Sequence, residues 1–246
     1  MSKATQHRRE RERQEREQRI LEVSRQMLVR DGYHGLNMDR VAEALEYSKG
    51  TIYNHFSCKE EIILALAIET MDKRTQMFER GTTFQGSSRE RLQAIGVASE
   101  LFVRLYPDHF LVEQVIRSSS IWEKTSEQRR NLLRMCEFRC MGIVGGIVRD
   151  GIASGDLVLP AEVNVEELVF GMWSLSFGAF SIIATSDSLV ELGIRDGFEA
   201  VRLNITHMLD GYGWKPLSKN HDYLATVARV QEEVFRDESQ TAQARR

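Results

Sequence analysis

The sequence of 246 residues predicts an all-α protein. Apolar residues recur three or four positions apart over long segments, and no segment shows the strict alternation that predicts a strand. The three prolines, Pro107, Pro160 and Pro216, all fall between such segments. With 42% hydrophobic and 28% charged residues, the composition is that of a soluble globular protein, and the length suits a small domain plus a larger one.

The first 17 residues are almost wholly polar and alternate basic with acidic side chains. This pattern favours a solvated, partly frayed extension of the first helix, while an arm that reaches nucleic-acid phosphates stays open as the alternative. These residues contain no apolar signal sequence, and no uncharged apolar run of 18 residues is expected elsewhere. We therefore expect no membrane span and a cytoplasmic location.

Three helices are expected in the segment that follows. Apolar residues at helical spacing predict the first helix over residues 20–30, and Gly32 and Gly35 end it. A second helix begins at Met38, with one apolar face. Residues 46–48 interrupt that face, and Ser48 suits the N-cap of a third helix over residues 49–56.

The third helix has an unusual outward face. Ile52 and Phe56 are four positions apart and point inward, which leaves an ammonium, a hydroxyl, a phenol, an amide and an imidazole facing out. These groups belong to Lys49, Thr51, Tyr53, Asn54 and His55. Such donors suit phosphates and base edges, whereas an ordinary solvated helix carries pairs of Glu and Lys.

The rest of the chain is a series of long helical segments. A fourth helix opens at Cys58-Lys59 and runs to about Arg80, and six more are expected at residues 89–106, 108–120, 125–154, 163–185, 195–210 and 222–236. The predicted organisation is a polar arm (1–17), a three-helix DNA-binding domain with a helix-turn-helix (18–66, motif 37–56), a larger helical bundle (67–212) and a C-terminal extension (213–246).

Residues at fixed offsets identify the motif further. They are Val41-Ala42, Ser48-Lys49-Gly50-Thr51-Ile52-Tyr53, His55-Phe56 and Lys59-Glu60. The segment resembles the DNA-binding motif of the tetracycline-repressor (TetR) family of bacterial regulators, and the match spans about residues 20–66. The family usually has Ala-Gly-Val at the turn, where this chain has Leu45-Glu46-Tyr47. A left-handed conformation at Glu46 would cost roughly 1–2 kcal/mol.

The resemblance implies a transcriptional regulator, expected to be a repressor, whose homodimer binds a near-palindromic double-stranded operator. Tyr53 and His55 occupy positions that contact the DNA backbone in the family, and Asn37 stands at the cap that touches phosphate. We expect Lys49 and Lys59 to contact phosphates, the latter at a helix N-terminus. Base contacts are assigned to Thr51 and Asn54, and Gly50 permits close approach of the backbone.

The larger domain is expected to bind a small hydrophobic or amphipathic effector that releases DNA. An aromatic and methionine-rich set suits such a pocket, since these side chains re-pack around varied ligands: Trp122, Phe138, Met141, Trp173 and Phe177. For any single member, a place in the core is the simpler explanation. Small residues in 163–185, with apolar residues of the next helix, favour a helix-pair interface between two copies, and an intramolecular core is the alternative.

Other functions have less support. The net charge of −3 does not itself favour a nucleic-acid binder, but residues 1–66 hold 12 basic and 11 acidic residues, against 21 and 25 in the remainder. Three cysteines make no disulfide framework, which favours a reducing compartment, and a redox-responsive pair Cys136/Cys140 stays an alternative. A ligand-independent DNA-binding protein is another. No metal site, cofactor or enzymatic activity is expected.

Overall fold

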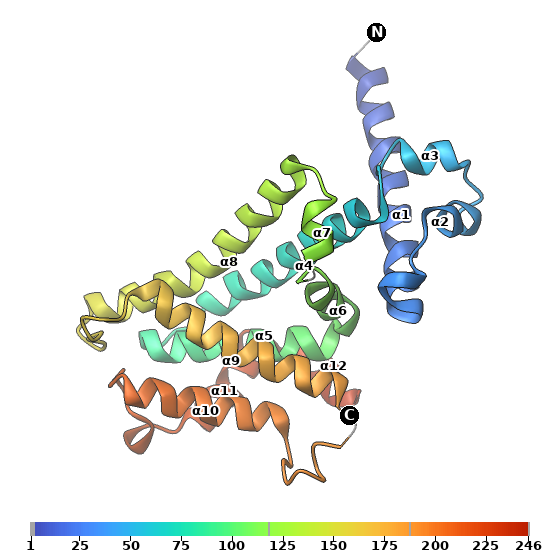
Figure 1. Ribbon diagram of the computed structural model, residues 1–246. Helices are drawn as coiled ribbons and strands as arrows, with labels where there is room; N and C mark the ends of the chain where they lie inside the picture. The colour runs from blue at the N-terminus through green and yellow to red at the C-terminus, as the bar shows by residue number, and fades with distance from the viewer. Residues whose placement is uncertain (1–2, 118, 187, 246) are drawn as a thin grey trace. The chain divides into compact units, whose positions relative to one another are not determined.

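The computed structural model describes residues 3–117, 119–186 and 188–245, and over these ranges the chain forms helices and no strand (Figure 1). The predicted all-α class is confirmed. The chain divides into two compact units, one comprising Met1–Met71 and Asp108–Met135, the other Asp72–Pro107 and Cys136–Arg246. The first unit is therefore built from two separate stretches of chain.

The first unit holds the expected helix-turn-helix. Its elements are α1 (Lys3–Gly35), α2 (Met38–Ala44), α3 (Lys49–Tyr53), the start of α4 (Lys59–Thr82), α6 (Pro107–Val115), α7 (Ser119–Glu123) and the start of α8 (Glu127–Ala153). Its core contains Ile20, Leu28, Val41, Ile52 and Phe56, all almost fully buried. The predicted helical faces of residues 20–30, 38–45 and 49–56 thus point inward as expected.

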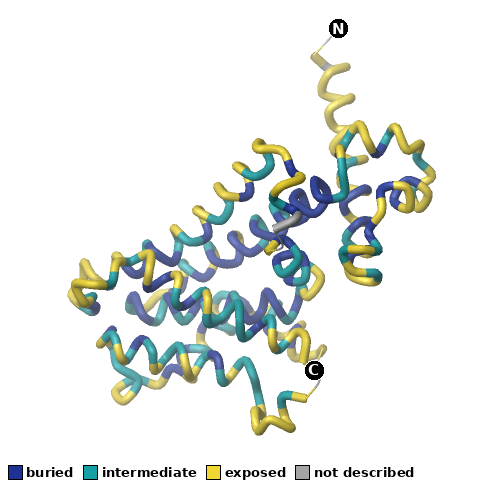
Figure 2. The backbone as a smooth tube through the Cα atoms, in the orientation of Figure 1, coloured by how far each residue is buried: buried dark blue, intermediate teal, exposed yellow. Residues whose placement is uncertain are grey.

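Helix α1 is much longer than the predicted segment 20–30. It begins at Lys3, so the polar arm is a regular extension of this helix and is exposed to solvent (Figure 2). Gly32 has φ 68° and ψ −177°, a conformation that an L side chain rarely adopts, and this residue breaks the helical path before Gly35. The glycine therefore ends the regular helix where the sequence predicted.

The segment 108–135 lies in the first unit, whereas the sequence-based domain boundaries assigned it to the larger bundle. Side chains of α4 hold it in the first unit: Thr70 Oγ1 lies 3.0 Å from His109 Nδ1, and Glu60 lies 3.3 Å from the ammonium of Lys124. The single helix expected over 108–120 is two, α6 and α7. These long-range pairs follow from the folded path, and no local sequence pattern reveals them.

The second unit contains the rest of α4 and α8, with α5 (Ser88–Leu105), α9 (Val165–Thr185), α10 (Gly197–Gly211), the short 3₁₀ helix η1 (Ser218–Asn220), α11 (Tyr223–Glu233) and α12 (Arg236–Ala244). Helices α11 and α12 pack on α5, and Trp214 and Phe235 are fully buried. The C-terminal extension is therefore part of this unit's core. Arg89 of α5 holds the extension in place by donating hydrogen bonds to the carbonyls of Trp214 and Pro216. It also donates to the carbonyl of Thr206 in α10.

Helix α9 is the most apolar long segment and packs beside α10 (Figure 1). Residues 168–185 contain no charged side chain, so the expectation that no such run exists was wrong. By length and composition α9 could cross a membrane, since the mean hydropathy of its most apolar 18 residues is 1.7. Only 22% of these residues are buried. Phe170 and Ile182 of α9 and Leu203 of α10 are exposed large apolar side chains.

Candidate DNA-binding surface

The helices of the motif are capped as the sequence predicted. The Asn37 side chain accepts a hydrogen bond from the Asp39 backbone N–H at 2.8 Å and begins α2. The Ser48 hydroxyl accepts from the Thr51 N–H at 3.1 Å and begins α3. Each cap satisfies a donor that has no partner inside its helix, which fixes where both helices start.

The turn between α2 and α3 places Glu46 in the left-handed region, with φ 55°. The Glu46 N–H donates to the Glu43 carbonyl at 3.1 Å, and the Tyr47 N–H donates to the Ala42 carbonyl at 2.9 Å. This pair of bonds is the Schellman motif, which satisfies the last carbonyls of a helix and normally uses glycine. The turn therefore keeps the glycine geometry with a glutamate in its place.

The exposed face of α3 carries the expected polar groups. The side chain of Lys49 is 68% exposed and Tyr53 is 51% exposed, and Asn54 is also exposed. Thr51 is half-buried, with its hydroxyl 2.8 Å from that of Ser48. A Cβ built on Gly50 would meet no atom closer than 3.8 Å, so the glycine leaves its backbone uncovered without filling a tight packing need.

Lys49 has a partner that the sequence analysis missed. Its ammonium lies 2.6 Å from the Asp39 carboxylate on α2, and this hydrogen bond raises the pKa of Lys49. The two residues are ten positions apart and meet only because the turn folds α3 back on α2. The only sequence signal for this ion pair was the position of Asp39, two residues after the N-cap Asn37.

Two expected contact residues are engaged by other parts of the first unit. The imidazole of His55 is only 7% exposed, with Nδ1 3.8 Å from a Glu17 carboxylate oxygen, so its expected outward position was wrong. Helix α3 ends at Tyr53 with Asn54 as the C-cap, and His55 therefore leaves the outward face. The Lys59 ammonium donates to the Tyr33 carbonyl at 2.8 Å and lies 4.0 Å from the Tyr33 ring centroid.

A further basic side chain lies in α2. Arg40 is 2.8 Å from the Asp31 carboxylate and donates to the Gly35 carbonyl at 3.0 Å. Hydrogen bonds from Arg30 and Arg40 lower the pKa of Asp31 to about 2. These bonds tie the end of α1 to α2.

The proposed ligand-binding set is only partly assembled. Trp173 lies between Phe170 and Phe177 on α9, with ring centroids 5.8 and 6.0 Å apart. Phe138 is 75% exposed on α8, so its ring lies on the surface of a single chain. Met141 is half-buried on the same helix, and Trp122 belongs to the first unit.

The cysteines show no sign of an activated thiol. Cys136 is half-buried with its sulfur 3.7 Å from the Asp72 carboxylate, and burial together with Asp72 raises its pKa. A raised pKa lowers the thiolate fraction and so the reactivity. Cys140 is buried. Within the described ranges, no group of three His, Cys, Asp or Glu side chains could hold a metal ion.

Comparison with known proteins agrees with this geometry. Residues 20–66 match the family model described as "Bacterial regulatory proteins, tetR family". The chain is 24% identical over 181 residues to the "Fatty acid metabolism regulator protein" of Bacillus subtilis strain 168, covering 70% of this chain and 91% of that protein.

Solved structures share the fold. A bacterial regulatory protein of the tetR family from Rhodococcus RHA1 superposes with a TM-score of 0.63 at 16% identity, covering 80% of this chain and 97% of that one. The regulator PfmR from Thermus thermophilus gives a TM-score of 0.56 at 20% identity, covering 75% and 93%. At these identities the structural similarity shows the fold alone. The relation to the tetR family rests on the match of residues 20–66 to the family model.

Proposed function

We propose that this chain, whose residues 20–66 match the tetR-family model, is a transcriptional repressor of that family, which a small hydrophobic or amphipathic effector releases from its operator. The observation that carries the proposal is the capped α2–turn–α3 motif with the polar side chains of Lys49, Tyr53 and Asn54 exposed on one face. Its rival, a ligand-independent DNA-binding protein, shares that face but would respond to no compound.

We assign the contacts of this face by their chemistry. Lys49, Tyr53 and Asn37 bind phosphates, and Thr51 and Asn54 read base edges, where hydroxyl and amide groups discriminate between base pairs. Gly50 lets the backbone of α3 approach the duplex. His55 and Lys59 contact neighbouring parts of the first unit, and the ammonium of Lys59, which donates one hydrogen bond to the Tyr33 carbonyl, has further N–H donors that can bind a phosphate.

The exposed apolar side chains of α9 and α10 support a homodimer. Only 22% of the most apolar 18 residues of α9, whose mean hydropathy is 1.7, are buried, which leaves a large apolar surface. Monomeric soluble proteins rarely expose such a surface. The occupant we propose is a second copy, with α9 and α10 of each chain forming a four-helix bundle. Two motifs then reach successive major grooves, about 34–36 Å apart on a near-palindromic site.

The effector is proposed from two observations. The α9 ladder of Phe170, Trp173 and Phe177 offers an apolar wall of the kind that binds acyl or aromatic groups. The Bacillus subtilis relative is named as a regulator of fatty acid metabolism, which fits an amphipathic molecule with an acyl chain. The redox alternative at Cys136 has less support, because this half-buried thiol lies 3.7 Å from the Asp72 carboxylate, and burial and that negative charge raise its pKa.

The test is a selection from random duplex DNA by the full-length protein, followed by titration of the recovered sequence. The proposal expects a near-palindromic site bound by a dimer, and release of that DNA when a series of fatty acids is added. Recovery of no preferred sequence would contradict the DNA-binding function. Selective binding that none of the compounds weakens would favour the ligand-independent rival.

A further inference from the structure

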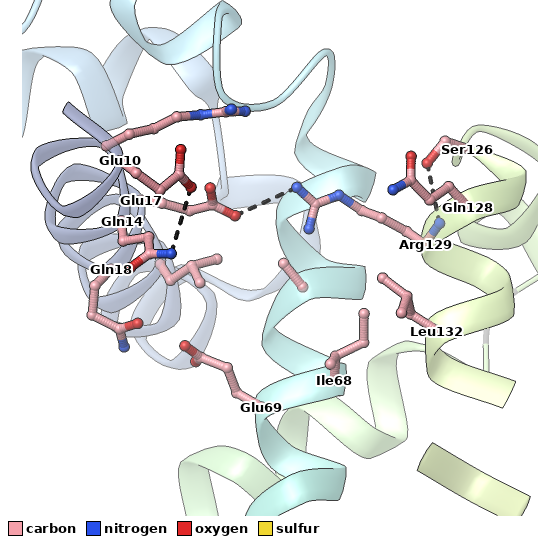
Figure 3. Close-up of a pocket in the computed structure, with 13 residues that line it drawn as sticks. Glu10, Gln14, Glu17, Gln18, Ile68, Glu69, Ser126, Gln128, Arg129 and Leu132 are labelled. Atoms are coloured by element: carbon pink, nitrogen blue, oxygen red, sulfur yellow. Dashed lines mark hydrogen bonds and ion pairs between the residues drawn. The ribbon is translucent and has the colours of Figure 1, made fainter. Parts of the chain in front are cut away.

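Arg129, in the first turn of α8, contacts side chains from three other parts of the first unit. Its guanidinium lies 2.7 Å from Glu61 on α4 and 3.5 Å from Glu17 on α1, and 4.8 Å from the ring centroid of Phe56. Figure 3 shows Arg129 reaching from α8 toward Glu17, at the edge of a pocket of about 610 Å³. One side chain thus joins α1, α4 and the segment that follows α3.

The bond to Glu61 fixes where Arg129 sits. The Glu61 side chain is buried and also accepts a hydrogen bond from the Ser126 backbone N–H just before α8. A buried carboxylate needs such partners, because an unpaired charge in the interior is strongly destabilising. The start of α8 is therefore held on α4 by the ion pair between Arg129 and Glu61, and breaking this pair would be energetically costly.

The contacts to Glu17 and Phe56 both lead to the end of α3. The other carboxylate oxygen of Glu17 lies 3.8 Å from Nδ1 of His55, whose side chain is buried. His55 and Phe56 are the two residues that directly follow the C-cap of α3. Arg129 therefore reaches this end of the helix twice, through Glu17 and through the ring of Phe56.

A helix of five residues depends on its ends. Helix α3 is too short to be stable alone, since isolated helices of fewer than about 12–15 residues are marginal in water. The Ser48 cap fixes its N-terminal end. We infer that Arg129 is a positioning residue for DNA recognition, which fixes the C-terminal end of α3 against α1 and α4; this inference rests on the proposed function.

The test compares two variants that remove one positive charge each from α8. Arg129→Gln breaks the contacts above, and Arg134→Gln is the control, because Arg134 is exposed and bonds only to neighbouring Asn131 at 2.9 Å among the contacts described. Both full-length variants are titrated with the duplex that the parent selects from a random pool and with a scrambled duplex of equal length. Circular dichroism and melting confirm folding at the assay temperature.

Arg129→Gln is expected to lose about tenfold or more in affinity for the selected duplex, the effect of misplacing a base contact. On the scrambled duplex it should match Arg134→Gln within about twofold, because phosphate binding needs no exact helix orientation. A loss of the same factor on both duplexes, or values equal to the control on both, would overturn the inference, since neither result changes selectivity.

A second variant covers the case in which Arg129→Gln does not fold. Glu17→Gln removes the more exposed partner and keeps the buried bond of Arg129 to Glu61. It should lower selectivity in the same way, and unchanged selectivity would overturn the inference. A parent that selects no sequence contradicts the proposed function itself, whereas a selective parent with unaffected variants contradicts only the role of Arg129.

Discussion

The ammonium of Lys49 lies 2.6 Å from the carboxylate of Asp39, across the turn that joins α2 to α3. The pair places an acidic group beside the residue proposed to meet a phosphate. In the free protein Asp39 neutralises Lys49, and in the complex the phosphate must compete for the same ammonium. The two residues therefore have opposite expected effects on DNA affinity.

Lys49→Ala should weaken binding to selected and scrambled DNA alike. Loss of one phosphate contact should also reduce the slope of log affinity against log salt by about 1. The measurement is a titration over a range of salt concentrations. Asp39→Asn is the matched variant, which keeps the side-chain shape and should raise affinity. An unchanged slope for Lys49→Ala would show that this ammonium meets no phosphate.

Thr51→Ala and Asn54→Ala should change preference among operator variants more than total affinity. A lost base contact costs about 1–3 kcal/mol at the base pair it reads and little elsewhere. The measurement is a competition series with every single base-pair change in the selected duplex. Equal loss on all sequences would mean that these residues hold the backbone and that other residues read the bases.

Glu46→Gly should stabilise the protein by about 0.5–1 kcal/mol. The left-handed conformation at φ 55° costs an L residue about 1–2 kcal/mol, and the greater freedom of glycine in the unfolded chain offsets part of the gain. Thermal unfolding measures the difference. Glu43→Gly is the control, since Glu43 is exposed within helical α2, and there glycine should cost about 1 kcal/mol. Equal effects of the two changes would refute the strain at Glu46.

Acid should weaken the attachment of the C-terminal extension. Burial opposes ionisation of Asp210, but hydrogen bonds from Ser218 and the ion pair with Arg89 at 2.7 Å prevail and lower its pKa. A carboxylate with a lowered pKa contributes stability above its unfolded value of about 3.9, and that stability is lost as the pH falls through the folded value.

Unfolding measured between pH 3 and 7 checks this expectation. Asp210→Asn should be less stable than the parent at pH 7 and should lose less stability on acidification. Parallel curves for the two proteins would show that Asp210 is not linked to folding.

Trp173→Ala should weaken effector binding while DNA binding by the free protein stays nearly intact. Its half-buried ring packs beside Phe170 and Phe177, so it can contribute to a ligand complex without filling the core. The measurements are a fatty acid titration, a DNA titration and a melting curve on the same variant. A loss of about 3–5 kcal/mol in stability together with DNA binding would instead place Trp173 in the core.

The sequence predicted elements with a strong local signal. The apolar faces of α1, α4, α5 and α8 and the caps at Asn37 and Ser48 are all local, and each is present. Helix α12 was missed because its sequence is polar, and it is held by distant partners such as the bond between Arg80 and Glu238. Local pattern says nothing about such partners.

The same limit explains the errors at the candidate site. Helical periodicity placed His55 on the outward face, but α3 ends before it and the imidazole turns toward Glu17 on α1. The spacing between Lys49 and Asp39 spans a turn, so no periodicity connects them. Residue type and cap position could be predicted, whereas direction after a helix end depends on the packing of other segments.

The first unit, assembled from two stretches of chain, also sets an order of events during synthesis. Residues 1–71 leave the ribosome before the start of α8 exists, so Arg129 and the Ser126 amide reach Glu61 only after about 60 further residues are made. At about 5–20 residues per second, this delay is on the order of several seconds. A nascent chain therefore carries the complete helix-turn-helix sequence before it can complete the unit that holds it.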